Sequence, residues 1–329
     1  MATSFKTLGS DDVQAVRTKL HEAIPITGSI LSGTYKSGDV ELNVKNYPHG
    51  MFQSVYDYPY LSSSANQIFD ITVGYCSGSV LSSSTSIQNE QKIQIYNQMA
   101  QVLVGHDTTG SIRKFAEDGG IGNGTKIKEA IFINFARLLS KDEIKKGGFE
   151  IRFSVNPTGS YPGNGGALTD CQVYVQDISG AASPPSFKSD SPAGEYNILY
   201  ASGSTFVTGK QTLVEDNVAC GLLYYQAGIA VLTASLFVTE LSGGLVNTAI
   251  APGGDGSGAS AFAGAIWLSG STKTTEGAGG IINLLTGSAI SSSADGIRAH
   301  MQNTSFNNTT ELNSTVYFCR AHNNEFNFS

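Results

Sequence analysis

Charged side chains are scarce in this chain. Asp, Glu, Lys and Arg make up 14% of its 329 residues, whereas an ordinary soluble domain has about 25%. The 20 Lys and Arg are outnumbered by 27 Asp and Glu, so the formal net charge is -7. Because nucleic-acid binding depends on a basic surface that neutralises phosphates, this composition argues against direct binding to nucleic acid.

Cysteine is also sparse. The 4 cysteines are Cys76, Cys171, Cys220 and Cys319, with no C-x-x-C pair among them. Neither the density of a secreted disulfide scaffold nor the spacing of a zinc site is present, so we expect buried thiols. Cys319 and His322 are spaced like half of a zinc site, but no second pair of ligands accompanies them.

Long apolar runs are limited to residues 220–238, "CGLLYYQAGIAVLTASLFV". The run carries no charge, but Tyr224, Tyr225 and Gln226 make it too polar for a lipid-facing helix. Residues 226–228 are typical of a tight turn between two β-rich runs. We therefore expect two buried strands and no membrane span. The opening residues, "MATSFKTLGSDDVQ", lack the basic-then-apolar pattern of a secretory signal.

Recognisable catalytic motifs are missing as well. His106 stands beside Asp107 in "VGHDTTG", where a base would be possible, but a solvated turn after a helix explains the pair better. Residues 253–260, "GGDGSGAS", have the glycines of a phosphate-binding loop without its Lys-Ser/Thr end. Residues 117–125 lack the alternating acidic ligands of a calcium loop. We predict no catalytic residue, no metal and no cofactor, and we interpret the protein as not being an enzyme.

Glycine and strand-like patterns are abundant instead. The chain has 38 glycines, and residues 149–155 alternate strictly between apolar and polar side chains. Further apolar or alternating segments lie at residues 171–175, 196–200 and 222–237, separated by Gly, Pro and Ser turns. The sequence predicts a mainly β protein with a few helices (α+β), built on an antiparallel sheet or sandwich core.

Helical spacing marks three segments. The first is expected over residues 11–24, ends at Pro25, and has an apolar stripe made of Val13, Val16, Leu20 and Ile24. The second lies near residues 87–104, and the third within residues 293–303. We divide the chain into an N-terminal helical arm (1–30), a main β-rich domain (31–241), a Gly/Ala/Ser-rich insertion (242–294) and a C-terminal helix and strand (295–329).

Aromatic side chains gather in two places that we predict to be interaction surfaces. The first group, between residues 47 and 75, includes Tyr47, Phe52, Tyr56, Tyr58 and Tyr60. Packing in the core or between subunits is the favoured interpretation, and binding of a partner or a sugar is the alternative. The second group, in the closing "STVYFCRAHNNEFNFS", consists of Tyr317, Phe318, Phe326 and Phe328.

The chain resembles a known family in six segments. They read "LHEAIPITGSILSGTY", "NVKNYPHGMFQSVYDYPYLSSSANQIFDITVGY", "IYNQMAQVLVGHDTTGSI", "FINFARLLSKDEIKKGGFEI", "GLLYYQAGIAVLTASLF" and "YFCRAHNNEFNFS". These segments resemble virion structural proteins of contractile-tailed bacteriophages, in the T-even-like group that infects marine cyanobacteria. The resemblance covers nearly the whole chain except residues 242–294, and it brings no catalytic residues with it.

The resemblance implies a structural component of the virion, assembled in the host cytoplasm. Its implied partners are copies of itself and other virion structural proteins. We favour the tail, baseplate or neck, because the chain lacks the long helix of a major capsid subunit. Three alternatives stay open: a receptor- or glycan-binding tail module in contact with the host surface, a capsid-associated protein, and a virion-borne hydrolase.

We make two predictions about the end of the chain. In the family that it resembles, the "EFNFS" segment is followed by an Asn-Pro turn and more chain, so we expect continuation beyond Ser329. If the chain ends there, residues 316–319 should pair with a strand of this subunit or of a neighbour. That pairing should bury Tyr317 or Phe318.

Overall fold

The computed structural model describes residues 8–31, 35–37, 40–79, 82, 87–120, 124–154, 172–203, 218–234 and 290–319. The elements are η1 (Ser10–Asp12), β1 (Val13–Thr27), α1 (Gly28–Leu31), β2 (Lys36–Ser37), β3 (Val40–Glu41), β4 (Val44–Asn46), β5 (Gln53–Tyr56), β6 (Gln67–Tyr75), α2 (Ile87–Leu103), β7 (Glu129–Phe135), α3 (Arg137–Ser140), β8 (Glu143–Ile144), β9 (Glu150–Ser154), β10 (Gln172–Gln176), η3 (Ser179–Ala181), β11 (Lys188–Ser191), β12 (Gly194–Gly203), β13 (Val218–Tyr224), β14 (Ile229–Thr233), α5 (Ile290–His300) and β15 (Met301–Tyr317).

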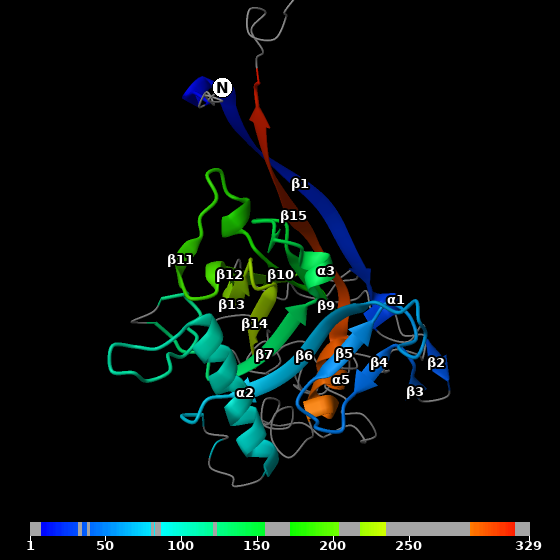
Figure 1. Cartoon of the computed structure of the whole chain (residues 1–329). Coiled ribbons are helices and arrows are strands. Elements are labelled where there is room, and N and C mark those ends of the chain that lie inside the picture. The colour runs from blue at the N-terminus through cyan, green and yellow to red at the C-terminus, as the bar shows by residue number, and fades with distance from the viewer. Residues whose placement is uncertain are drawn as a thin grey trace, which may run out of the picture.

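A 13-stranded curled sheet dominates the fold (Figure 1). Its order is β1-β15-β9-β10-β12-β13-β14-β7-β6-β5-β4, with β11 on β12 and β8 on β15, while β2 and β3 form a separate pair. The named strands pair in antiparallel fashion throughout. In the described ranges, α2 and α5 are the only α-helices of more than four residues. The predicted fold class, mainly β with a few helices, is confirmed.

The described part of the apolar run, residues 220–234, forms the hairpin that its pattern predicts, and residues 235–238 lie outside the described residues. β13 and β14 pair from Gly221↔Leu232 to Tyr224↔Ile229. Gly228 closes the turn with a φ of 67°, a left-handed conformation that glycine adopts without a Cβ clash. Over the parts of the chain that the structure describes, no helix is long and apolar enough to cross a membrane.

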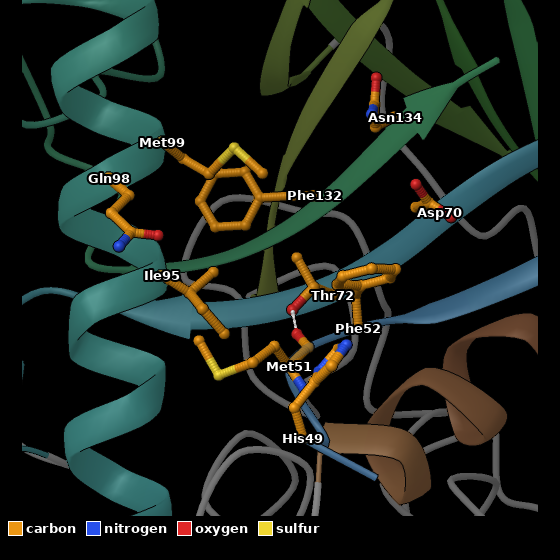
Figure 2. Close-up of a pocket in the computed structure, with 10 residues that line it drawn as sticks. All are labelled: His49, Met51, Phe52, Asp70, Thr72, Ile95, Gln98, Met99, Phe132 and Asn134. Carbon is orange, nitrogen blue, oxygen red and sulfur yellow. Dashed lines mark hydrogen bonds between the residues drawn. The ribbon is translucent and has the colours of Figure 1, made fainter. Parts of the chain in front are cut away.

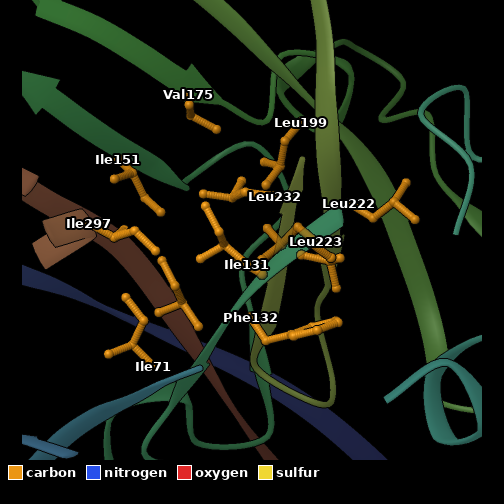
Figure 3. Close-up of a cluster of buried hydrophobic side chains, with 14 of the residues drawn as sticks. Ile71, Ile131, Phe132, Ile151, Val175, Leu199, Leu222, Leu223, Leu232 and Ile297 are labelled. Carbon is orange, nitrogen blue, oxygen red and sulfur yellow. The ribbon is translucent and has the colours of Figure 1, made fainter. Parts of the chain in front are cut away.

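The hydrophobic core lies against the inner face of the curled sheet. Because opposite residues of antiparallel strands share a face, Ile71, Ile133, Ala230 and Leu223 form one continuous apolar row across β6, β7, β14 and β13. α5 packs against β5, β6 and β15 and places Ile297 beside this row (Figure 3). The helix therefore fills the inside of the curl.

The opposite face of β6 and β7 is covered by α2. At Gly74, an added Cβ would lie 2.7 Å from the carbonyl oxygen of Lys92 and 2.9 Å from the backbone nitrogen of Tyr96. The helix backbone therefore approaches the sheet more closely than a side chain on residue 74 would allow. Next to this contact the rings of Tyr96, Phe115 and Phe132 pack on one another, with centroids 5.5 to 6.3 Å apart.

The helix predicted over residues 11–24 is wrong. After a single 3₁₀ turn, η1, the segment forms the 15-residue strand β1. Val16, Leu20 and Ile24 are four residues apart, a spacing that suits one face of a helix and also one face of a strand. Pairing with β15, which lies almost 300 positions away, decides between them. The N-terminal arm is therefore an extended strand.

The C-terminal part agrees with the prediction in type but not in extent. α5 confirms a helix before the last strand, although it begins at Ile290 inside the range assigned to the insertion. β15 is 17 residues long, whereas the sequence marked only residues 316–319. Most of the predicted insertion, residues 242–289, lies outside the described residues.

Candidate functional site

The two strands β1 and β15 leave the body of the protein together as a ribbon (Figure 1). Near the body, β15 also pairs with β9 through Met301–Ser305 and with β8 through Asn308–Thr309. Beyond Thr309 its described pairing is with β1 alone. We call residues 13–20 and 310–317 the outer ribbon.

One face of the outer ribbon carries four exposed aliphatic side chains, which alternate with Gln14, Thr18, Thr310 and Ser314. Opposite residues share a face, so Val16, Leu20, Leu312 and Val316 lie on the same side, together with Ile24 and Phe306 nearer the body. Ile24 is partly buried and Phe306 is buried in the core, but Leu20 is 52% exposed and Leu312 is 51% exposed. Apolar residues, which are buried near the body, therefore recur at the same spacing in the outer ribbon, where they are exposed to solvent. We call this side the apolar face.

The other face, which we call the polar face, carries the charged side chains of the ribbon along with Val13, Ala15 and Tyr317, and it lies beside charged groups of the body. Arg17 pairs with Glu311 at 2.5 Å, and Lys19 reaches Glu143 at 3.3 Å. Hydrogen bonds from Arg17 and Asn313 lower the pKa of the Glu311 carboxyl. These side chains line a hollow of about 540 Å³ together with body residues, including Arg137, Asp142 and Glu195. The charged side chains Arg17, Lys19 and Glu311 therefore lie on the face opposite Val16, Leu20, Leu312 and Val316.

The tip of the ribbon holds two of the aromatic residues that the sequence singled out. Tyr317 pairs with Val13, and the backbone N–H of Phe318 donates to the carbonyl of Asp12 at 2.8 Å. Residues 316 and 317 pair with a strand of this subunit, which is one of the two pairings expected if the chain ends at Ser329. The expected burial is wrong for the single chain, since Tyr317 is 60% exposed and Phe318 is 53% exposed. Phe326 and Phe328 lie outside the described residues.

The other predicted interaction residues surround β4 and β5, apart from the ribbon tip. The rings of Tyr47, His49 and Phe52 pack together with centroids 4.9 to 5.1 Å apart. Tyr56 contacts Tyr60 at 6.2 Å, and Tyr58 contacts Tyr35 at 5.3 Å. Burial and a hydrogen bond with Tyr47 raise the pKa of Tyr56 to about 12. Of the five predicted residues in this group, Tyr58 is exposed and the other four are half-buried.

A pocket of about 430 Å³ opens between α2 and the sheet (Figure 2). Its residues come from the loop after β4, from β6, from α2 and from β7: His49, Met51, Phe52, Asp70, Thr72, Ile95, Gln98, Met99, Phe132 and Asn134. Sequence reasoning missed this pocket because four separate segments build it. The available signal was Asp70, an acidic residue inside the apolar strand "IFDITVGY".

The cysteines divide between the core and the ribbon. Cys76 and Cys220 are buried, as expected, and burial raises the pKa of the Cys220 thiol. The expectation is wrong for Cys319, which is exposed just beyond β15. Cys171 lies outside the described residues.

The one histidine–aspartate pair considered as a base forms a turn. Asp107 Oδ1 accepts hydrogen bonds from the backbone N–H groups of Thr109 and Ser111 and from the Thr109 hydroxyl. These bonds lower the pKa of Asp107, and His106 is exposed beside it. In the described part of the chain, no group of three or more His, Cys, Asp and Glu residues has the arrangement of a metal site.

Comparisons with known proteins matched no family model, no curated protein and no solved structure.

Proposed function

We propose that the chain is a structural subunit of a contractile-tailed phage virion, placed in the tail, baseplate or neck. It assembles with copies of itself and with other virion proteins through the outer ribbon. The observation that carries this proposal is the apolar face, where Val16, Leu20, Leu312 and Val316 are all exposed. The assignment to a phage virion rests on the resemblance of the sequence to virion structural proteins.

Physical reasons favour a partner for the apolar face. A two-stranded ribbon is marginally stable on its own in water, and a third strand or a packed surface stabilises it. Within the described sheet β1 is an edge strand, and its outer side has no described strand partner. Covering each half-exposed aliphatic side chain contributes about 1 kcal/mol. Several such contacts, repeated by the symmetry of an assembly, hold subunits together.

A receptor- or glycan-binding module is the second candidate. The half-buried rings around β4 and β5, the exposed Tyr58 and the Lys45 ammonium 4.7 Å from the Tyr47 ring centroid favour it. Tyrosine rings of this kind supply rigid contact area to a ligand. A glycan array separates the candidates, because a blank array removes this one and leaves assembly through the ribbon untouched.

Neighbouring residues on opposite faces of the ribbon provide the test. Val16→Glu and Leu312→Glu place a charge on the apolar face, whereas Ala15→Glu and Asn313→Glu place the same charge on the polar face of the same strands. We expect the first pair to reduce self-association by tenfold or more, because burying an unpaired carboxylate is costly. The second pair should change it little. Sedimentation velocity over a range of protein concentrations measures the effect.

Equal behaviour of the two pairs of variants would contradict assembly through the apolar face. The virion setting has its own test, because immunogold labelling with an antibody against the chain should decorate tails or baseplates of phage particles. Labelled capsids alone would move the protein to the capsid.

A further inference from the structure

The pocket between α2 and the sheet has a polar end made by two neighbouring strands. Asp70 on β6 and Asn134 on β7 are register partners, and they lie side by side at one end of the pocket (Figure 2). Asp70 Oδ1 accepts hydrogen bonds from Ser54 Oγ and Gln67 Nε2, both at 2.5 Å. Among the described residues, Asp70 Oδ2 and the Asn134 carboxamide have no hydrogen-bond partner in the protein. Two acceptor oxygens are therefore available at this end.

The rest of the pocket is mainly apolar. Its apolar lining consists of Met51, Phe52, Ile95, Met99 and Phe132. Ile95 and Phe132 are buried, and the other three are half-buried. The volume of about 430 Å³ lies within the range of about 300 to 1,000 Å³ that is typical of small-molecule sites. An elongated ligand with one polar end fits this distribution.

The walls of the pocket are held in place. The Thr72 hydroxyl on its floor donates to the Met51 carbonyl at 2.6 Å, which ties the loop after β4 to β6. Phe52 is braced by Tyr47 and His49, whose rings stack 5.1 Å apart. A preformed pocket loses less conformational entropy when a ligand binds.

Charge selects the class of ligand. None of the ten lining residues is Lys or Arg, and Asp70 is the one acidic residue among them. An ammonium group at the polar end would receive two acceptors from Asp70 Oδ2 and Asn134 Oδ1, and Phe52 and Phe132 would offer ring surface to the cation and its body. We propose that this pocket binds a primary ammonium ligand with an apolar or aromatic body, such as an arylalkylamine.

The partial burial of Asp70 supports a cation over a purely apolar occupant. Burial raises the pKa of this carboxyl, while the hydrogen bonds from Ser54 and Gln67 lower it. An apolar ligand would remove more water from Asp70 without offering a partner, which costs free energy. An ammonium ligand supplies the missing opposite charge. The inference is independent of the ribbon and of the proposed virion function.

Three probes of the same shape test the proposal: phenethylamine, 2-phenylethanol and phenylacetate. The chain has 4 methionines, of which Met51 and Met99 line the pocket and Met301 is buried in the core. Methyl-¹³C methionine labelling of the full chain therefore reports binding by NMR. We expect phenethylamine to shift the Met51 and Met99 signals and to leave Met301 unchanged. Its affinity should exceed that of the alcohol by tenfold or more, with the carboxylate weakest.

Asp70→Asn gives the matched variant, because it keeps the shape and removes the charge. It should lower phenethylamine affinity by tenfold or more and leave the affinity for 2-phenylethanol within about twofold. Asp11→Asn, on the exposed η1 turn, serves as the control and should change neither affinity. Lowering the pH should weaken binding of the amine as Asp70 is protonated, with no such trend for the alcohol.

Three outcomes would overturn the proposal. They are no shift of Met51 or Met99 with phenethylamine at millimolar concentration, equal affinities for the three probes, and an unchanged amine affinity in Asp70→Asn. The unchanged chemical shift of Met301 in the variant shows that the core has remained folded.

Discussion

Two buried or partly buried aspartates differ in how completely the protein satisfies them. Asp177 is only 2% exposed, and its two oxygens accept four hydrogen bonds. The donors are the N–H groups of Gly147 and Gly180, the Asn197 side chain and the Tyr225 hydroxyl. Asp70 receives its described bonds at one oxygen only. A carboxylate that is fully bonded belongs to the structure, whereas one with a free oxygen in a pocket is suited to a ligand.

Lys92 gives a prediction for the dependence of stability on pH. This residue of α2 is fully buried, and burial lowers its pKa from 10.5 to about 8. Between these two values Lys92 binds more protons in the unfolded chain than in the folded one, so this residue contributes a rise in stability as the pH increases from 8 to 10. Cys220 and Tyr96, whose pKa values burial raises from 9.0 and 10.0, oppose this contribution in the same range, so the effect of Lys92 is measured as the difference between a variant and the parent chain.

Lys92→Met should remove this contribution, so the change in the free energy of unfolding from pH 8 to pH 10 should be less favourable in the variant than in the parent chain by about 1 to 2 kcal/mol. Urea unfolding followed by circular dichroism at several pH values measures it. Lys128→Met is the matched control, because Lys128 is exposed, and it should keep the pH dependence of the parent chain. The same pH dependence in Lys92→Met and in the parent chain would contradict the assignment.

At the scale of the element, the position of α2 depends on the missing side chain at Gly74. Gly74→Ala would bring a Cβ to 2.7 Å from the Lys92 carbonyl oxygen, a backbone atom that moves only if the whole helix moves. We expect a loss of about 1 to 3 kcal/mol in the free energy of unfolding. The amine affinity of the adjacent pocket should also change, because Ile95 and Met99 move with the helix.

Gly78→Ala is the control for that substitution. There the nearest atom is the flexible end of Lys114, at 3.0 Å, so little strain should result. Chemical denaturation of both variants, together with methionine-methyl NMR, separates them. A Gly74→Ala variant with the stability of the control would show that α2 sits less firmly than its close approach indicates.

At the scale of the whole molecule, the outer ribbon is separable from the body. Residues 13–18 and 312–317 are exposed, and their described pairing is with one another. A chain shortened to residues 19–311 keeps the contacts of Lys19 and of Asp142 with the ribbon base. We expect its thermal unfolding to stay within a few degrees of the full chain, because little apolar surface is lost from the core.

The same truncation should abolish self-association, since it removes Val16, Leu312 and Val316 from the apolar face. Sedimentation velocity and thermal unfolding of the shortened chain test both expectations. A shortened chain that still assembles would place the contact on the body, and one that fails to fold would show that the ribbon supports the sheet.

Several parts of the fold were readable from residue patterns. The β13–β14 hairpin follows from two apolar runs around Gly228, β9 follows from the alternation after Phe149, and α2 follows from apolar residues at helical spacing. In each case neighbours in the sequence carry the signal. The β1 strand and the pocket were not readable, because their partners are distant in the chain.

The sequence by itself determined the class of the protein: a glycine-rich, weakly charged, mainly β chain whose short-range patterns specify hairpins and helices. Only the tertiary structure decided that Val16, Leu20 and Ile24 lie on a strand. It also decided that the apolar face, which they share with residues of β15, extends beyond the body and is exposed there. It likewise placed Asp70 beside Asn134 at the end of an apolar pocket. The reason is physical: periodicity reports local geometry, whereas exposure and the convergence of side chains depend on non-local pairing.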